Sequence, residues 1–312
     1  MPTPGLSARF GDRLLAGEPL SKYTAARLGG PADWLYIARE SVDELAEVVS
    51  AAWAQAMPVR VLGGGANVLV ADRGVRGLVV INRVSQVEFG EWHEGRTASA
   101  AAGTSLSVLA HKCQAHGLAG MEWAASVPGT VGGAVVNNAG AHGSDMAATL
   151  ADAVVLEADR GASLYACDDL QYGYRYSILK VRADRRFLVL LATFRLPPDS
   201  PDAIKARMAE FVAYRKRTQP PGASLGSIFK NPPGDYAGRL IEAAGLKGFA
   251  IGGAMVSPVH ANFFTSDGSQ NASAADYYAL IRHVRDTVER HSGVRLELEI
   301  ELVGEHEPPP HV

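Results

Sequence analysis

The stretch that most constrains the fold is Val59–Asp72, VRVLGGGANVLVAD, in which one apolar run ends in three glycines and a second apolar run follows. This pattern predicts a strand, a glycine turn and a second strand. Gly63, Gly64 and Gly65 have no β-carbon, so their N–H groups can close around the phosphates of a ligand. A Rossmann fingerprint would open into a helix, and we therefore expect another kind of nucleotide site. A plain tight turn is the alternative for this run alone.

The composition is that of an ordinary globular protein. The chain has 312 residues, of which 47% are hydrophobic and 20% charged, and this length allows about two or three domains. Its formal charge is −3, with Lys and Arg spread through the sequence, so we expect neither a nucleic-acid nor a membrane partner. No apolar run approaches the roughly twenty residues of a membrane span.

The cysteines and the first residues favour a cytoplasmic protein. Cys113 and Cys167 are too few for a disulfide framework, and the start MPTPGLSARF lacks the apolar core of a signal peptide. Cys113 and His116 share a helical spacing but lack two further ligands. We therefore expect a reducing compartment and no metal site.

The first region alternates strands and a helix. A strand is expected at Trp34–Ala38, followed by a helix that begins with Ser41 and Glu44 as a capping box. After the glycine turn, a further strand is expected at Leu78–Asn82.

A second region, Val84–Leu196, consists of short strands with one clear helix, Ser105–His116. It contains a second glycine-rich stretch, Ser126–Gly143, SVPGTVGGAVVNNAGAHG. Because so few large side chains cannot fill a core, this backbone is expected to pack against something flat, such as a cofactor. Close helix packing through glycine is the alternative.

A third region follows Pro197 and Pro198, which interrupt regular structure. Hydrophobic periodicity predicts three helices here, the last with Ser273 as its cap and Gly293 as its stop: Ile204–Arg217, Tyr236–Ala244 and Tyr277–His291. The alternating segment Leu296–Leu302 is expected to be a strand with Glu297, Glu299 and Glu301 on one face.

The third region also carries a local excess of positive charge. Residues 205–247 hold eight basic and three acidic side chains, which suggests that this region binds an anion such as a diphosphate. Lys230 and Arg239 are better candidates than the basic residues of a solvated helix face. The loop Gly226–Pro232, GSIFKNP, adds the hydroxyl of Ser227. The G-x-S-x-G pattern at Gly222–Gly226 is no nucleophile elbow, because prolines replace the required strand.

An arginine among aromatic residues is a candidate for carboxylate recognition. Arg175 lies within YGYRYS at Tyr172–Ser177, where cation–π packing without a ligand is the alternative. The three glutamates of the final segment are equivalent by pattern, so the residues alone do not single out Glu299.

Seven motifs in order resemble the UDP-N-acetylenolpyruvoylglucosamine reductase (MurB) family: RLGGPAD, LGGGANVLVAD, SVPGTVGGAVVNNAGA, YGYRYS, GSIFKNP, AGRLIEAAGLKG and GVRLELEIEL. The match runs from Tyr23 to Gly304. The resemblance implies an α+β chain with the FAD-binding fold of the vanillyl-alcohol-oxidase (PCMH) type. It also implies FAD-binding subdomains at residues 17–83 and 84–196, a substrate-binding domain at 197–306, and a disordered tail at 307–312.

The resemblance implies an NADPH-dependent enzyme with non-covalent FAD, which reduces UDP-N-acetylglucosamine enolpyruvate to UDP-N-acetylmuramate for peptidoglycan synthesis. By motif, Ser227 is implied as the acid that protonates the carbanion, and Arg175 as the group that stabilises the developing negative charge. Glu299, the second glutamate of the LE-x-E motif, is implied to complete the site. We expect a monomer whose partner is the UDP-sugar substrate.

The family motifs also imply binding residues. The FAD contacts are implied at Gly63, Gly64, Gly65, Ala66, Asn67, Val68, Ser126, Pro128, Gly129, Gly132, Gly133, Asn138, Gly140 and Ala141. The substrate contacts are implied at Tyr174, Lys230, Asn231 and Arg239. Members often carry a lysine where this chain has Thr218. The short spacing from YGYRYS to GSIFKNP indicates the compact subtype, with an open site and no tyrosine lid.

Two other functions compete with this interpretation. One is an FAD-dependent alcohol or sugar oxidase of the same fold, in which His142 would attach the flavin covalently. The other is a nucleotide-binding module without catalysis, which would have no need of Ser227, Arg175 and Glu299.

Overall fold

The computed structural model describes residues 4–92, 95–266 and 272–306, so the predicted tail at 307–312 lies outside the described residues. The chain divides into two units. Unit 1 consists of Met1–Leu15, Trp34–Gly64 and Gly77–Arg215, and unit 2 consists of Ala16–Asp33, Gly65–Arg76 and Lys216–Val312.

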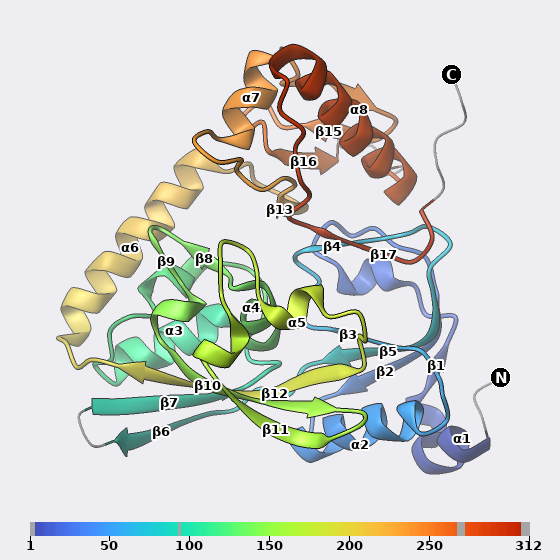
Figure 1. The fold of residues 1–312 in the computed structure, drawn as a ribbon, viewed down its shortest axis with the longest axis vertical. Coiled ribbons are helices and arrows are strands. Elements are labelled where there is room, and N and C mark those ends of the chain that lie inside the picture. The colour runs from blue at the N-terminus through green and yellow to red at the C-terminus, as the bar shows by residue number, and fades with distance from the viewer. Residues whose placement is uncertain (1–3, 93–94, 267–271, 307–312) are drawn as a thin grey trace. The chain divides into compact units, whose positions relative to one another are not determined.

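The largest sheet of unit 1 is antiparallel, in the order β11-β10-β12-β7-β6 (Figure 1). Its strands are β6 (Val87–Trp92), β7 (Gly95–Ala101), β10 (Leu150–Glu157), β11 (Gly161–Ala166) and β12 (Phe187–Leu196). Side chains of β12 reach two cores, and a register irregularity at Leu190 shifts their alternation by one residue. Leu188 and Leu190 pack on one face, and Val189 and Ala192 pack on the other.

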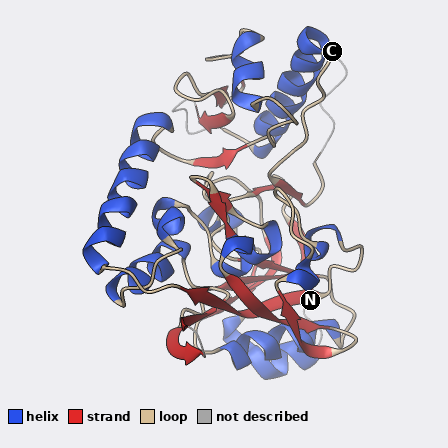
Figure 2. Ribbon diagram, turned by 60° about the vertical axis from the view of Figure 1, so that its left-hand side comes forward, coloured by secondary structure: helices blue, strands red, loops and turns tan. Residues whose placement is uncertain are grey.

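Helices cover both faces of this sheet, as the blue helices around the red strands show (Figure 2). The helices of unit 1 are α1 (Pro4–Phe10), α2 (Val42–Trp53), α3 (Leu106–Ala115), α4 (Val131–Asn137), α5 (Ile178–Val181) and most of α6 (Pro201–Thr218). Helix α2 packs on one side of β12 and α4 on the other. A helix at α4 was expected only as the alternative of close packing through glycine, since glycines are poor helix formers.

A second sheet has the order β1-β2-β5-β3, and its strands are β1 (Leu15–Ala16), β2 (Ala32–Ala38), β3 (Val59–Leu62) and β5 (Val75–Asn82). Helix α2 begins as predicted, since the Ser41 hydroxyl accepts a 3.0 Å hydrogen bond from the N–H of Glu44. The reciprocal half of the capping box differs. The Glu44 carboxylate accepts from the N–H groups of Arg39 and Glu40 instead of that of Ser41.

Unit 2 has its own sheet, in the order β13-β16-β15-β14. Its elements are β13 (Ser224–Ser227), β14 (Ala250–Ile251), β15 (Ala254–Val256), β16 (Phe263–Ser266), α7 (Ala237–Ala243) and α8 (Ala274–Ser292). The predicted ends of α8 are confirmed, because Ser273 and Asp276 form a capping box and Gly293 has a φ of +74°.

The prediction of one strand over Leu296–Leu302 is wrong. The structure has β17 only at Glu301–Val303, which pairs in parallel with β4 (Val68–Val70), while Leu298 makes an isolated bridge to Phe229. The chain changes its hydrogen-bonding partner between these two places, so no continuous ladder forms. The three glutamates are not equivalent either, since the side chain of Glu297 is 77% exposed and Glu299 is half-buried.

The helices predicted at 105–116, 204–217, 236–244 and 277–291 are confirmed to within a few residues. Among the described residues, the structure contains no helix with the length and apolar character that crossing a membrane requires.

Candidate active site

The first glycine turn packs directly against the second glycine-rich stretch within unit 1. A β-carbon at Gly63 would collide with the hydroxyl of Thr130, and one at Gly64 would lie 3.3 Å from the Cα of Gly129. Arg83 adds a 2.8 Å hydrogen bond to the carbonyl of Gly63. Glycine is therefore required here by close backbone approach. The two motifs that the sequence analysis assigned to one cofactor do lie together.

We call the glycine turn at 63–64 and the stretch 126–143 together the glycine-rich cradle of unit 1. Other glycines of this cradle have open space beside them. Nothing described lies within 4 Å of a β-carbon built on Gly129, and such a carbon on Gly133 would meet only the Thr130 hydroxyl at 3.8 Å. The hydroxyl of Ser126 is buried and has no hydrogen-bond partner among the described residues, which is uncommon in a folded protein. A backbone open to close approach and an unsatisfied buried hydroxyl fit a flat, polar cofactor such as FAD.

The side chain of Asn138 makes three hydrogen bonds in this region. This residue has a left-handed backbone with a φ of +44°, which asparagine tolerates better than most residues. Its buried amide donates to the carbonyl of Gly173 at 2.9 Å and to the carboxylate of Asp145 at 3.2 Å, and accepts from the N–H of Ala147 at 3.1 Å. Protein groups therefore satisfy both the nitrogen and the oxygen of this amide.

Arg175 lies against this asparagine. Its guanidinium donates to the carbonyl of Gly140 at 2.8 Å and to that of Asn138 at 3.5 Å, and it lies over the ring of Tyr174 at 5.3 Å. Its own backbone is left-handed, with a φ of +54°. The structure therefore places the guanidinium of Arg175 beside the second glycine-rich stretch, next to the short hairpin of β8 (Gly140–Ala141) and β9 (Ser144–Asp145).

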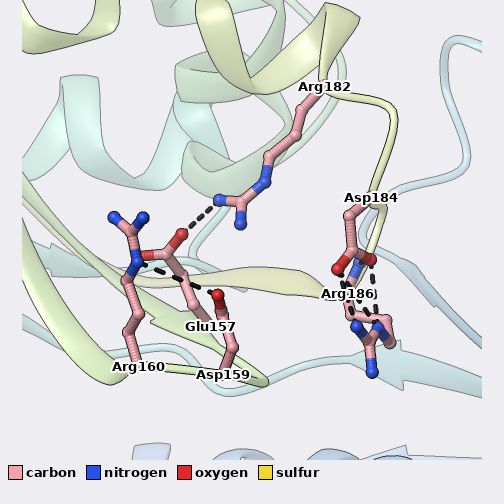
Figure 3. A network of polar contacts seen from close by, with 6 residues as sticks. All are labelled: Glu157, Asp159, Arg160, Arg182, Asp184 and Arg186. Atoms are coloured by element: carbon pink, nitrogen blue, oxygen red, sulfur yellow. Dashed lines mark hydrogen bonds and ion pairs between the residues drawn. The ribbon is translucent and has the colours of Figure 1, made fainter.

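The segment after Arg175 is anchored at several points. The ammonium of Lys180 donates to the carbonyl of Arg175 at 3.1 Å, and the hydroxyl of Ser177 caps α5 and donates to the carbonyl of Val136 at 2.6 Å. Beyond α5, Arg182 pairs with the buried carboxylate of Glu157 (Figure 3).

Ser227 and Glu299 are brought together within unit 2. The N–H of Glu299 donates to the carbonyl of Ile228 at 2.9 Å, so the two residues lie on adjacent backbone segments. Ser227 ends β13 and pairs with Phe263 of β16. Arg175 belongs to unit 1, so the common site of all three residues stays a prediction.

The end of the first glycine turn belongs to unit 2 and contacts the glutamate segment. The amide of Asn67 donates to the carbonyl of Glu299 at 3.1 Å, and the carbonyl of Asn67 accepts from the N–H of Glu301 at 2.9 Å. Gly65 has a φ of +60°, and a β-carbon there would collide with the backbone of Tyr23. Ala66 and Val68 lie on either side of Asn67.

The predicted substrate residues near GSIFKNP make protein contacts of their own. The ammonium of Lys230 lies 3.4 Å from the carboxylate of Glu297, and the guanidinium of Arg239 pairs with Asp235. The side-chain oxygen of Asn231 accepts from the N–H of Ala237 at 3.0 Å, at the start of α7. Tyr174 is exposed. Thr218 is the last residue of α6.

His142 lies near Arg215, a proximity that the sequence did not predict. The ring of His142 stacks on Phe211 at 4.2 Å, and its Nε2 is buried without a hydrogen-bond partner among the described residues. Burial and the nearby Arg215 lower the pKa of His142, and burial lowers the pKa of Arg215. Phe211 lies far from His142 in sequence, and no local pattern links the two.

No group of three His, Cys, Asp or Glu side chains that could hold a metal ion occurs in the described part of the chain. The two cysteines are free, and burial raises the pKa of Cys113 to about 12.

Comparisons with known proteins match both parts of the chain to described domains. An FAD-binding domain model matches residues 35–159, and the model of the C-terminal domain of UDP-N-acetylenolpyruvoylglucosamine reductase matches residues 218–303. The crystal structure of the Thermus caldophilus reductase is 35% identical in sequence, with a TM-score of 0.77 over 94% of this chain and 99% of that one.

Two relatives named UDP-N-acetylenolpyruvoylglucosamine reductase show how far the similarity extends. The one from Rubrobacter xylanophilus is 45% identical over 92% of this chain and 94% of its own length. The one from Agathobacter rectalis is 41% identical over 94% of each chain.

The matched FAD-binding domain and the fold thus define an FAD-binding oxidoreductase. Within that class, the chain belongs to the UDP-N-acetylenolpyruvoylglucosamine reductase family, whose FAD-containing members act in peptidoglycan precursor synthesis.

Proposed function

We propose that this protein reduces UDP-N-acetylglucosamine enolpyruvate to UDP-N-acetylmuramate, with NADPH as the electron donor and non-covalently bound FAD. The observation that carries the proposal is the pairing of the Ser227 and Glu299 segments through the carbonyl of Ile228. A hydroxyl and a carboxylate on adjacent segments are the groups that the proton transfer of this reduction needs.

When bound, FAD would supply a hydride, derived from NADPH, for the terminal carbon of the substrate's double bond. Ser227 then delivers a proton to the neighbouring carbon, so that one hydride and one proton saturate the bond. A serine hydroxyl is a weak acid, but a reactive carbanion and nearby cations make the transfer favourable. Glu299 completes this part of the site.

Arg175 is proposed to stabilise the negative charge that builds on the enol and its carboxylate. Its guanidinium is already held by the carbonyls of Gly140 and Asn138. A fixed orientation means that little reorganisation is needed when the charge develops.

The glycine-rich cradle is proposed to hold FAD. The open backbone faces of Gly129 and Gly133 and the unsatisfied hydroxyl of Ser126 support this assignment. The remaining proposed contacts are Gly63, Gly64, Gly65, Ala66, Asn67, Val68, Pro128, Gly132, Asn138, Gly140 and Ala141.

The substrate's UDP-sugar is proposed to contact Tyr174, Lys230, Asn231 and Arg239. Lys216 or Arg217 is proposed to replace the lysine that is absent at Thr218, since both are exposed near the end of α6. The subdomain limits at 17–83, 84–196 and 197–306 stay predictions. So does action as a monomer in the cytoplasm, where nucleotide substrates are made; sedimentation would test the monomer.

A purified sample tests the function. We expect a yellow protein that releases its flavin on acid denaturation and oxidises NADPH only when the enolpyruvyl UDP-sugar is present. Covalent flavin with consumption of oxygen would instead identify the oxidase. NADPH oxidation at a rate that does not depend on the UDP-sugar would also overturn the proposal.

A further inference from the structure

The backbone that follows Ser227 is held along both of its edges. On one edge, hydrogen bonds of 2.8 and 2.9 Å join residues 228–230 to residues 297–299. In an extended chain, successive peptide groups point to opposite edges. The N–H and C=O of Phe229 therefore face the other edge.

Asn262 occupies that other edge. Its Nδ2 donates to the carbonyl of Phe229 at 2.8 Å, and its Oδ1 accepts from the N–H of Phe229 at 3.0 Å. The carbonyl of Asn262 also accepts from the N–H of Ile228 at 2.9 Å. Asn262 is only 3% exposed, so its amide satisfies both polar groups of Phe229 in place of water or a neighbouring strand.

A side chain is needed here because the backbone ladder stops. Ser227 pairs with Phe263, the first residue of β16. Just before β16, the N–H of Asn262 donates a 3.2 Å hydrogen bond to the Nδ1 of His260. The backbone therefore does not continue along Phe229, and the Asn262 side chain extends the pairing by one residue.

We propose that Asn262 is a positioning residue for the proton donor. By fixing Phe229, it holds Ser227 on one side and, through the pairing with residues 297–299, Glu299 on the other. This inference rests on the proposed function, in which Ser227 delivers the proton. A displacement of about 1 Å can slow such a step roughly 100-fold, so the effect of Asn262 falls on the proton-dependent half of the reaction.

The first test is Asn262→Ala, studied with the flavin-loaded protein in a stopped-flow instrument. Reoxidation of the reduced flavin by saturating enolpyruvyl UDP-sugar should slow by about 10- to 100-fold. Reduction of the flavin by NADPH should stay within about twofold of wild type. The dissociation constant for FAD, measured by ultrafiltration and flavin absorbance, should not change.

Asn262→Asp provides a conservative variant with a pH signature. A protonated carboxyl can donate to the carbonyl of Phe229 and accept from its N–H, whereas a carboxylate can only accept. The reoxidation rate of this variant should therefore recover as the pH falls. Rates are divided by those of wild type at each pH, so that the pH dependence common to both proteins cancels.

Val284→Ala is the matched control for lost stability. Val284 is fully buried in α8 and belongs to the core of unit 2, so its truncation should destabilise the same unit by about 1–2 kcal/mol. Both half-reactions should keep their wild-type rates. Equal slowing in Val284→Ala and Asn262→Ala would show a general loss of stability and overturn the proposal.

Ser227→Ala, measured in parallel, separates the role of Ser227 as proton donor from the role of Asn262 as positioning residue. If Ser227→Ala still reoxidises at the wild-type rate, the proposed proton donor is wrong. If Ser227→Ala loses reoxidation while Asn262→Ala keeps it within twofold, only the role of Asn262 is wrong. Should Asn262→Ala not fold, Asn262→Asp decides alone, and a flat normalised pH profile overturns the proposal.

Discussion

The glycine-rich cradle of unit 1 and the serine–glutamate segment of unit 2 reach their geometry by different means. In the cradle, Gly63 and Gly64 approach Thr130 and Gly129 so closely that side chains are excluded. In the serine–glutamate segment, which comprises residues 227–230 and 297–299, the buried side-chain amide of Asn262 binds the backbone of Phe229. The first arrangement depends on residues that have no β-carbon, and the second depends on particular hydrogen bonds.

This difference decides how each region should respond to substitution. A steric arrangement fails when a methyl group is added, and the failure should appear first in cofactor binding. A hydrogen-bonded arrangement fails when a donor or acceptor is lost, and the failure should appear in the step that needs the positioned group. Variants in each region can therefore confirm or break the contrast.

The largest effect is expected for Ser227→Ala. Reduction of the flavin by NADPH should continue, while its reoxidation by the enolpyruvyl substrate should slow by about 10³-fold or more, because only the second half-reaction needs the proton. Stopped-flow absorbance of the flavin measures both. Ser224→Ala, in the same strand β13, is the control and should keep both rates. Equal slowing of the two half-reactions would refute the acid assignment.

Gly63→Ala and Gly133→Ala compare two glycines of the cradle. Gly63→Ala should lower the free energy of unfolding of the flavin-free protein by about 1–3 kcal/mol, because the protein has no room for the methyl group. Gly133→Ala should leave that stability equal or raise it by up to about 1 kcal/mol, because Gly133 lies within α4 with space beside it.

The affinity for FAD distinguishes these two variants more clearly than their stability does. If the cofactor approaches the open side of Gly133, the new methyl group should weaken FAD affinity by about tenfold or more, as a clash of about 1.4 kcal/mol or more would. Equilibrium titration of the flavin-free protein with FAD measures this. Unchanged affinity in Gly133→Ala would remove Gly133 from the cofactor site.

The same contrast explains what the sequence revealed about the fold and the site. Glycine runs and helix caps such as Ser273 and Gly293 are local signals, and the elements they predicted are present. The strand expected over Leu296–Leu302 was wrong because alternation reports buried faces and not the partner of each backbone group. Asn262 carries no local signal at all. Its partner Phe229 is distant in sequence, so only the fold shows the contact.

The pair Glu157 and Arg182 tests whether unit 1 also contains an essential polar anchor. Glu157→Gln leaves the guanidinium of Arg182 without its buried carboxylate (Figure 3). Loss of a buried ion pair lowers stability by about 3–5 kcal/mol, and we expect about 2 kcal/mol because Arg182 is 24% exposed. Urea unfolding measures the change.

The exposed pair of Asp184 and Arg186 is the matched control. Asp184→Asn should have no measurable effect on stability, because water screens an exposed pair. Since the Arg175 segment has further anchors at Ser177 and Lys180, Glu157→Gln should also keep both flavin half-reactions near wild type. A large loss of substrate-driven reoxidation would show that unit 1, too, depends on a polar clamp.

The smallest effect is expected for His142→Phe, which tests the buried Nε2 of His142 in the second glycine-rich stretch. The pKa of folded His142 is lowered by burial and by Arg215, so below about pH 6.5 the unfolded chain binds a proton that the folded chain does not. His142 therefore contributes a loss of stability as the pH falls below about 6.5, and nothing above it.

Phenylalanine keeps the stacking on Phe211 but cannot take up a proton. The loss of stability between pH 7.5 and pH 5 should therefore be smaller in His142→Phe than in wild type, although His260 and His306, whose pKa values are also lowered by burial, keep part of it. Absolute stability is a poor measure here, because residue 142 has a left-handed φ of +54° that phenylalanine tolerates less well than histidine. The slope with pH is the informative quantity in urea unfolding. Equal dependence of the unfolding free energy on pH in the two proteins would mean that His142 is not held neutral in the folded protein. The packing of unit 1 would then be looser around polar groups than around its glycines.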